Sequence, residues 1–381
     1  MTLLDLALAL LLALCGLLLV WPFLGYPLIL RLLPARPVAR AEEGAIPTPS
    51  TSLLFCAYNE AASLPAKIEN LRQLKARNPA LEILAFDDGS TDETAALLGG
   101  AGDLLTLVRG PGRSGKAHGM KALAARATGE VLIFTDANVL LDADAVDRLL
   151  VYYADETVGG VLGSLRYDGA GSSASASVGA LYWRIEEHLK DGESRTGNVM
   201  GADGSIFSIR RSLYPDFPDS VLDDLTVSMA VVFAGKRLLK AKDVIAREMM
   251  VAKREDEYRR KVRIAARSWH THLHLRPQLA RMSRLDRFKY GSRKLIRWFG
   301  ALWIGLGALA GMLLAWRIAP LAAIALAAAA LFLLLAGLQM RRGPLAAVLD
   351  LLLAYLATFK GIVLAMRGQT VTTWNPAQSR D

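Results

Sequence analysis

The fold is decided by a stretch that begins with TSLLFCAYNE (residues 51–60) and continues through LEILAFDDGSTDET (81–94) to VLIFTDAN (131–138). Short apolar runs bounded by polar or glycine residues predict four buried strands, at residues 52–57, 81–86, 104–108 and 131–135. Amphipathic stretches between them predict helices at 61–77, 92–98 and 116–127. This alternation implies an α/β fold with a parallel sheet and helices on both faces.

Polar clusters follow three of the four predicted strands, and they are Tyr58-Asn59-Glu60, the run 87–92 and the run 135–138. In open α/β sheets, ligands bind at the carboxyl ends of the strands. No G-x-G-x-x-G follows the first strand and no GxxxxGK[ST] occurs, which disfavours dinucleotide binding and P-loop chemistry. An acidic crevice needs a cation before it can hold a nucleotide diphosphate. We therefore expect Mg²⁺ or Mn²⁺ beside Asp136 and Asn138, which share one face if the chain there is extended.

Six motifs in order give a specific resemblance: FCAYNEA, AFDDGSTDET, GRSGKAHGMKAL, IFTDAN, GADGSIFSIRR and VLDDLTVS. Together they resemble a family 2 glycosyltransferase, the inverting and nucleotide-sugar-dependent class with the Rossmann-like GT-A fold. The branch they resemble is the membrane-embedded one related to cellulose, hyaluronan and poly-N-acetylglucosamine synthases. The match covers roughly residues 50–270.

The resemblance implies a donor site for a nucleotide-diphosphate sugar, with a UDP-sugar expected. Its residues would be Ala57, Tyr58 and Glu60 around the base and ribose, Asp87 or Asp88 accepting from the base, and Lys116 near the diphosphate. The family's metal-binding DxD falls on Asp136 and Asn138. Because Asn138 replaces the second acid, one anionic ligand is missing.

The resemblance also implies the catalytic base. Asp223 and Asp224 occupy the place of the family's TED motif, whose final acid is the base, so Asp224 is preferred over Asp223. Inversion needs a carboxylate that takes the proton of the attacking hydroxyl. It also needs a cation that stabilises charge on the departing diphosphate.

One family motif is absent. The processive members contain QxxRW, and the nearest stretch here is RRKVRIAARSW (residues 259–269). Arg260 and Arg263 are candidates to pair with the diphosphate; the alternative is a basic helix that rests on lipid headgroups. Without QxxRW, transfer of one or a few sugars to a lipid-linked acceptor is as well supported as polysaccharide synthesis.

The composition divides the chain between membrane and water. Of 381 residues, 53% are hydrophobic and 21% are charged, which excludes both a disordered chain and one that lies wholly in a membrane. The formal net charge is +9, whereas residues 253–297 alone amount to +11. This basic block runs into an apolar segment, so we expect it to contact anionic membrane lipids and not nucleic acid.

Apolar segments bracket the polar block. We expect a transmembrane signal anchor at 1–33, a GT-A domain at 48–275, a basic amphipathic interfacial segment at 276–297, two or three transmembrane helices within 298–367, and a tail at 368–381. Arginines follow the anchor, so the positive-inside rule places the catalytic domain in the cytoplasm. The expected location is the cell membrane, in a bacterium the inner one, with several passes.

The sequence leaves one alternative function open and disfavours another. Asn138 and the missing QxxRW also fit a weak or inactive glycosyltransferase-like subunit of a polysaccharide assembly or export complex. A nucleotidyltransferase would need a Gly-rich basic loop after the first strand, and AYNEAAS (residues 57–63) contains neither glycine nor a basic residue.

Overall fold

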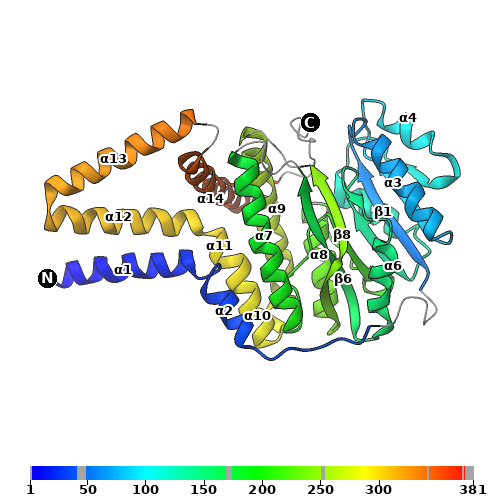
Figure 1. Ribbon diagram of the computed structural model, residues 1–381, viewed down its shortest axis with the longest axis horizontal. Helices are drawn as coiled ribbons and strands as arrows, with labels where there is room; N and C mark the ends of the chain where they lie inside the picture. Colours follow the sequence, from blue (N-terminus) through cyan, green and yellow to red (C-terminus); the bar gives the residue numbers. More distant parts are fainter. Residues whose placement is uncertain are drawn as a thin grey trace.

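The computed structural model describes residues 2–40, 49–168, 174–249, 254–340, 343–370 and 373. Its centre is a sheet with the strand order β3-β2-β1-β4-β7-β6-β8-β5 (Figure 1). The strands are β1 (Thr51–Ala57), β2 (Glu82–Asp87), β3 (Thr106–Arg109), β4 (Val131–Thr135), β5 (Leu140–Leu141), β6 (Val158–Asp168), β7 (Ile206–Arg210) and β8 (Arg237–Met249). All four predicted strands are present, with ends that differ by at most two residues.

Helices cover both faces of this sheet. They are α3 (Leu64–Arg77), α4 (Thr94–Gly99), α5 (Lys116–Ala124), α6 (Ala145–Leu150), α7 (Ala174–Arg195), α8 (Asp223–Phe233) and α9 (Arg254–Arg281). The alternation of side chains along each strand divides the core in two. Leu54, Cys56 and Phe134 pack with α5 and α8, while Leu53 and Phe55 pack with α3 on the opposite face.

The sheet is mostly parallel, as the α/β alternation predicts, but not throughout. β1 pairs parallel with both β2 and β4, and β2 pairs parallel with β3. β7 lies antiparallel between β4 and β6, and β5 pairs antiparallel with β8. An apolar strand has the same pattern in either direction, so its orientation is set by the connection and not by its residues.

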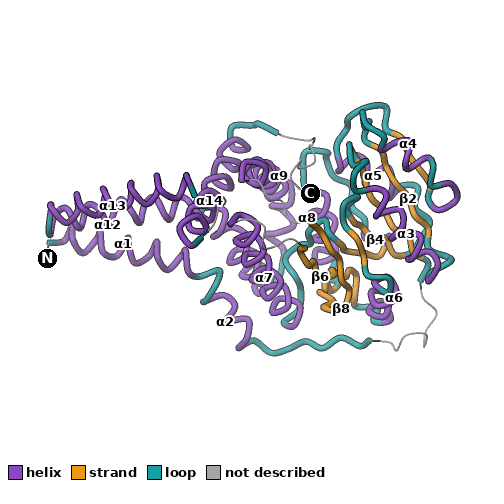
Figure 2. Tube along the Cα trace, turned by 45° about the horizontal axis from the view of Figure 1, so that its top comes forward, coloured by secondary structure: helices purple, strands orange, loops and turns teal. Residues whose placement is uncertain are grey.

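Four helices are long and apolar enough to cross a membrane, among the residues that the structure describes. They are α1 (Leu3–Val20), α12 (Gly300–Ile318), α13 (Pro320–Gln339) and α14 (Pro344–Met366). α1 and α12 pack along each other and project away from the sheet, with α13 beyond α12 (Figures 1 and 2). Gly307 allows the close approach, because a Cβ there would lie 3.1 Å from that of Cys15.

α14 packs along the basic helix α9, which distinguishes it from the other three apolar helices. At Gly361 the two backbones are so close that a Cβ would strike the carbonyl oxygen of Val262. Asp350 of α14 pairs with Arg254, and the ammonium of Lys360 lies 5.7 Å from the ring centre of Tyr258. Both charged side chains of α14 therefore meet residues of α9.

The junction between the apolar helices and the sheet domain is formed by α2 (Gly25–Leu32), α10 (Arg284–Tyr290), the π-helical turn η4 (Gly291–Leu295), α11 (Ile296–Trp298) and α7. Arg293 is buried there between Glu186 and Glu193, whose carboxylates accept from it at 2.8 and 2.6 Å. The ammonium of Lys289 is buried as well and donates to backbone carbonyls. Two basic side chains of the expected interfacial segment 276–297 are therefore directed into the protein, where internal partners neutralise or solvate them.

Candidate active site

The parallel strands bring the predicted donor residues to one edge of the sheet. Ala57 and Asp87 are the last residues of neighbouring strands and are paired in register. The backbone N–H of Asp88 donates to the carbonyl oxygen of Ala57 at 3.0 Å, so the two strands leave the sheet together. β4, which ends at Thr135, pairs on the other side of β1. The polar residues that follow all three strands therefore lie at this edge.

The first loop is fixed to the second by hydrogen bonds. Asn59 has a φ of 50°, a left-handed conformation that asparagine tolerates, and its Oδ1 accepts from the backbone N–H of Thr91 at 2.8 Å. The N–H of Glu60 donates to the hydroxyl of Thr94 at 2.8 Å. Glu60 and Tyr58 are both buried. The guanidinium of Arg113 stacks 3.6 Å from the centre of the Tyr58 ring, a contact that no sequence pattern predicts.

Asp88 organises the loop before Lys116. Its Oδ1 accepts from the N–H and hydroxyl of Ser114 at 2.7 and 3.0 Å and from the N–H of Gly115 at 3.0 Å. Gly115 has a φ of +94°, a conformation that L-residues rarely adopt. The carboxylate of Asp87 accepts only from the N–H of Ser90, at 3.2 Å, among the hydrogen bonds of the described residues, so Asp87 is the better candidate of the two to accept a hydrogen bond from a base.

Lys116 lies at the centre of three acids. Its ammonium is 2.5 Å from Oδ1 of Asp136 and 3.7 Å from Oδ2 of Asp223. Burial alone would lower the pKa of Lys116, but the charges of Asp136, Asp223 and Asp224 outweigh it and raise that pKa. Residues from α5, the end of β4 and the start of α8 therefore meet around one ammonium group.

The pKa of Asp224 is raised toward neutrality. Burial and the neighbouring charge of Asp223 raise the pKa of Asp224 to about 7, although Lys116 opposes that shift. Its Oδ1 also accepts from the N–H of Leu225 at 2.6 Å. The start of α8 is fixed from α9, because the N–H of Leu222 donates to the hydroxyl of Thr271 at 2.8 Å.

The residues around Asp136 fit a divalent cation that is shared with a diphosphate. One lysine faces three carboxylates, an excess of negative charge that a divalent ion would offset. A Cβ on Gly204 would lie 2.9 Å from Oδ2 of Asp136, so only glycine leaves this side of the carboxylate free. Among the described residues, no group of three or more His, Cys, Asp or Glu side chains is arranged to hold a metal ion. Mg²⁺ typically binds one or two carboxylates and completes its shell with substrate phosphates and water.

The chain at Asn138 is not extended, which was the condition under which we expected Asn138 to share a face with Asp136. Residues 136–139 form a turn in which the N–H of Val139 donates to the carbonyl oxygen of Asp136 at 3.2 Å. Asp136 and Asn138 are nevertheless the half-exposed members of this turn, and Ala137 and Val139 are buried. The Nδ2 of Asn138 donates to Oε1 of Glu248, on β8, at 2.9 Å.

The two predicted arginines lie on α9. Arg260 pairs with Glu257 at 3.4 Å, and it also hydrogen-bonds Tyr167 and lies near Glu248. Arg263 is further along the same helix and is half-buried. Arg260 thus lies next to the partner of Asn138.

Sequence analysis missed Lys190, Asp203 and Glu248. The buried ammonium of Lys190 is 2.5 Å from Oδ2 of Asp203, which lies in the GADGS motif directly before Gly204. The charge of Asp203 also contributes to the raised pKa of Asp224. An acid in a glycine-bounded motif was a usable signal for Asp203, whereas nothing in the sequence marked its partner on α7 or Glu248.

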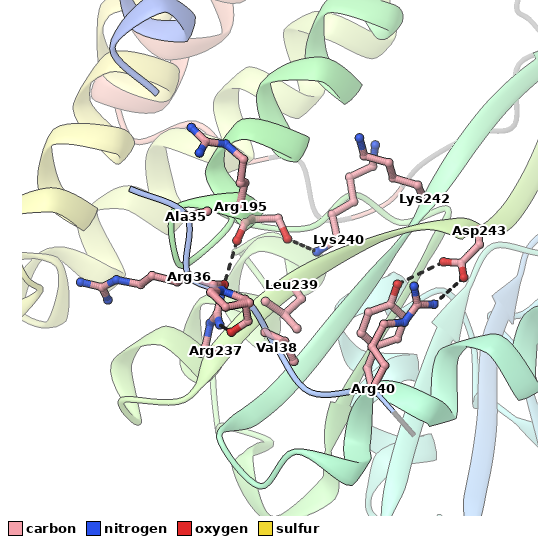
Figure 3. A pocket seen from close by; sticks show the side chains of 13 residues that line it. Ala35, Arg36, Val38, Arg40, Arg195, Arg237, Leu239, Lys240, Lys242 and Asp243 are labelled. Atoms are coloured by element: carbon pink, nitrogen blue, oxygen red, sulfur yellow. Dashed lines mark hydrogen bonds and ion pairs between the residues drawn. The ribbon is translucent and has the colours of Figure 1, made fainter. Parts of the chain in front are cut away.

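A cavity of about 460 Å³ lies elsewhere, beneath the segment that follows α2 (Figure 3). Among its lining residues are Arg36, Val38, Arg40, Leu239 and Asp243. It shares no residue with the acid cluster around Lys116.

Comparisons with known proteins agree with the motifs. Residues 52–217 match the family Glycosyl transferase family 2. Beta-monoglucosyldiacylglycerol synthase of Synechocystis sp. is 28% identical over 130 residues, which are 33% of this chain and 27% of that protein. An N-acetylglucosaminyltransferase of Mesorhizobium japonicum is 28% identical over 179 residues, 44% of this chain and 40% of that one. The chain thus spans less than half the length of either relative.

A solved structure shows the same fold over almost the whole chain. The mannosyltransferase PcManGT from Pyrobaculum calidifontis, in complex with GDP-Man and Mn²⁺, superposes with a TM-score of 0.72 at 22% identity. The likeness covers 94% of this chain and 99% of that one. Residues 52–217 are therefore a family 2 glycosyltransferase domain with the GT-A fold.

Proposed function

We propose that the chain is a membrane-bound, inverting glycosyltransferase that moves a sugar from a nucleotide-diphosphate donor, a UDP-sugar in the first instance, to a lipid-linked acceptor. The observation that supports this most is the meeting of Asp136, Asp223 and Asp224 around Lys116 at the carboxyl ends of the strands. Four apolar helices adjoin the domain, and one relative is named as the synthase of a glucosylated diacylglycerol, which favours a lipid acceptor over a free glycan.

Each polar residue has a role in this reaction. Asp224 accepts the proton of the acceptor hydroxyl, whose oxygen forms a bond to the anomeric carbon on the face opposite the diphosphate. The bond between that carbon and the diphosphate oxygen breaks, and the diphosphate leaves with its electron pair. Lys116 pairs with the diphosphate. A Mg²⁺ or Mn²⁺ ion held by Asp136 and Asn138 would neutralise the charge that develops on the leaving group.

The test separates chemistry from binding. We expect Asp224→Asn to reduce sugar transfer by about 10²–10⁴-fold, the usual contribution of a general base, while the Kd for UDP in Mn²⁺ stays within a few-fold of wild type. Donor binding is measured by calorimetry and transfer with the radiolabelled sugar. Asp216→Asn, at a residue outside the acid cluster, serves as the control.

Two outcomes would contradict the proposal. Wild-type turnover in Asp224→Asn would exclude that residue as the base. A wild-type protein that binds no UDP in Mn²⁺ would instead favour the inactive subunit of an assembly complex, a function for which Asn138 is the main argument.

A further inference from the structure

Asn138, which occupies the position of the second acid of the DxD motif, donates a hydrogen bond to a carboxylate. Nδ2 of Asn138 donates to Oε1 of Glu248 at 2.9 Å, although the two residues are 110 positions apart. The short strand β5 brings them together, because Leu140 pairs antiparallel with Arg247. A strand of two residues adds little to the sheet, but it brings the turn at 136–139 beside the end of β8.

This hydrogen bond fixes the orientation of the Asn138 amide. A carboxylate only accepts hydrogen bonds, so the group that meets Glu248 must be the NH₂ of Asn138. The carbonyl oxygen Oδ1 then points away from Glu248. A free asparagine could present either end to a cation, and the NH₂ end would repel it. Glu248 therefore selects the orientation in which Asn138 can act as a ligand.

Glu248 also brings a negative charge to the site. A carboxylate that accepts from a ligand's N–H makes that ligand more basic, as in the carboxylate–histidine pairs behind zinc, where loss of the outer partner weakens metal binding about 10–100-fold. Glu248 is held in place on β8 by its pairing with Tyr167 of β6. Tyr167 and Arg260 both face this carboxylate, so its surroundings are polar.

We propose that Glu248 is a positioning residue that orients and polarises Asn138 and so replaces the charge that the DxN sequence lacks. This inference rests on the proposed function, because it concerns the metal that the donor diphosphate shares with Asp136. On this inference, a DxN sequence supported by Glu248 can bind the metal, so Asn138 is not a sign of an inactive protein.

The experiment is a double-mutant cycle read as the Kd for Mn²⁺ with UDP bound, by calorimetry and by the Mn²⁺ electron paramagnetic resonance signal. We expect Glu248→Ala to weaken Mn²⁺ binding about 10–100-fold. The isosteric Glu248→Gln, which loses only the charge, is expected to weaken it by less. Asn138→Asp alone sets two carboxylates against each other and should not tighten binding, whereas Asn138→Asp combined with Glu248→Gln should restore the wild-type Kd or improve on it.

A matched control lies on the same strand. Asp243 pairs with Arg40 at 2.6 Å beside the cavity of Figure 3, so Asp243→Asn removes a carboxylate interaction of β8 away from the acid cluster. We expect its Kd for Mn²⁺ to equal that of wild type. Rescue by the double variant is an effect that a merely structural Glu248 would not produce.

The failures are distinguishable. If wild type binds no Mn²⁺ with UDP, the metal site of the proposed function is wrong. If wild type binds it and Glu248→Gln and Glu248→Ala leave the Kd unchanged, the inference is overturned. The same holds if Asn138→Asp changes the Kd equally with and without Glu248, because the two residues would then be uncoupled.

Discussion

At the scale of single residues, the candidate site consists of three acids around the ammonium group of Lys116. Its ammonium lies 2.5 Å from Asp136 and 3.7 Å from Asp223, while Asp224 is near enough to affect its pKa. Asp223 and Asp224 repel each other, and this repulsion adds to burial in raising the pKa of Asp224. Two adjacent acids thus differ in their surroundings: Asp223 contacts Lys116, and the pKa of Asp224 is raised to about 7.

This balance predicts the pH dependence of the reaction. A base acts only when ionised, so kcat/KM should fall as the pH drops through the pKa of Asp224, about 7. Asp223→Asn removes the larger of the two charges that raise this pKa in addition to burial, so the acidic limb should move to lower pH. The measurement is a profile of kcat/KM between pH 5 and pH 9 for both proteins. An acidic limb that Asp223→Asn leaves in place would contradict the assignment.

At the scale of elements, α9 positions the start of α8, where Asp223 and Asp224 lie. The hydroxyl of Thr271 accepts from the N–H of Leu222, directly before Asp223, and donates to the carbonyl oxygen of Arg267 at 2.8 Å. Arg267 is buried and donates to the carbonyl oxygen of Val221. α9, which contains the stretch nearest to the absent QxxRW motif, therefore holds the residues that directly precede Asp223 and Asp224.

Thr271→Val tests this support. Valine has the same shape but leaves the buried N–H of Leu222 without its acceptor, at a cost of about 1–3 kcal/mol. We expect kcat to fall several-fold while the Kd for UDP is unchanged, because only the first turn of α8 loosens. Thr358→Val is the matched control, since the hydroxyl of Thr358 also bonds to a carbonyl oxygen four residues back, on α14. Equal kinetics of the two variants would count against the role of Thr271.

At the scale of the whole molecule, a buried charge network joins the apolar helices to the sheet domain. Arg293 bonds Glu186 and Glu193, and the hydroxyl of Tyr26 donates to Glu193 at 2.5 Å. These residues come from α2, α7 and η4, which meet between the α1–α12 pair and the sheet (Figure 1). Paired charges thus occupy the surface where the two halves of the chain meet.

Arg293→Met should destabilise the protein strongly. Removal of one partner leaves buried carboxylates uncompensated, which typically costs about 3–5 kcal/mol. The expected result is a lower Tm in detergent, measured by the loss of near-ultraviolet circular dichroism. Arg284→Met, on the exposed surface of α10, should leave the Tm unchanged. An unchanged Tm for Arg293→Met would show that the network is not needed to join the two parts.

Local patterns in the amino-acid sequence were enough to predict the secondary structure and much of the chemistry. Apolar runs of strand length predicted β1 and β4, and long apolar runs predicted the helices of membrane-crossing length. The position of Asp136 at a strand end made it a candidate, whereas Asp224 was a candidate through the resemblance to the family motif. These features depend on neighbours a few residues apart, so their pattern is visible along the chain. Those patterns could not reveal that β7 runs antiparallel, that Asp88 accepts hydrogen bonds from a loop, or that Asn138 donates to Glu248. Such contacts depend on strand order and register, which bring together residues up to 110 positions apart, and many partners have the same local pattern.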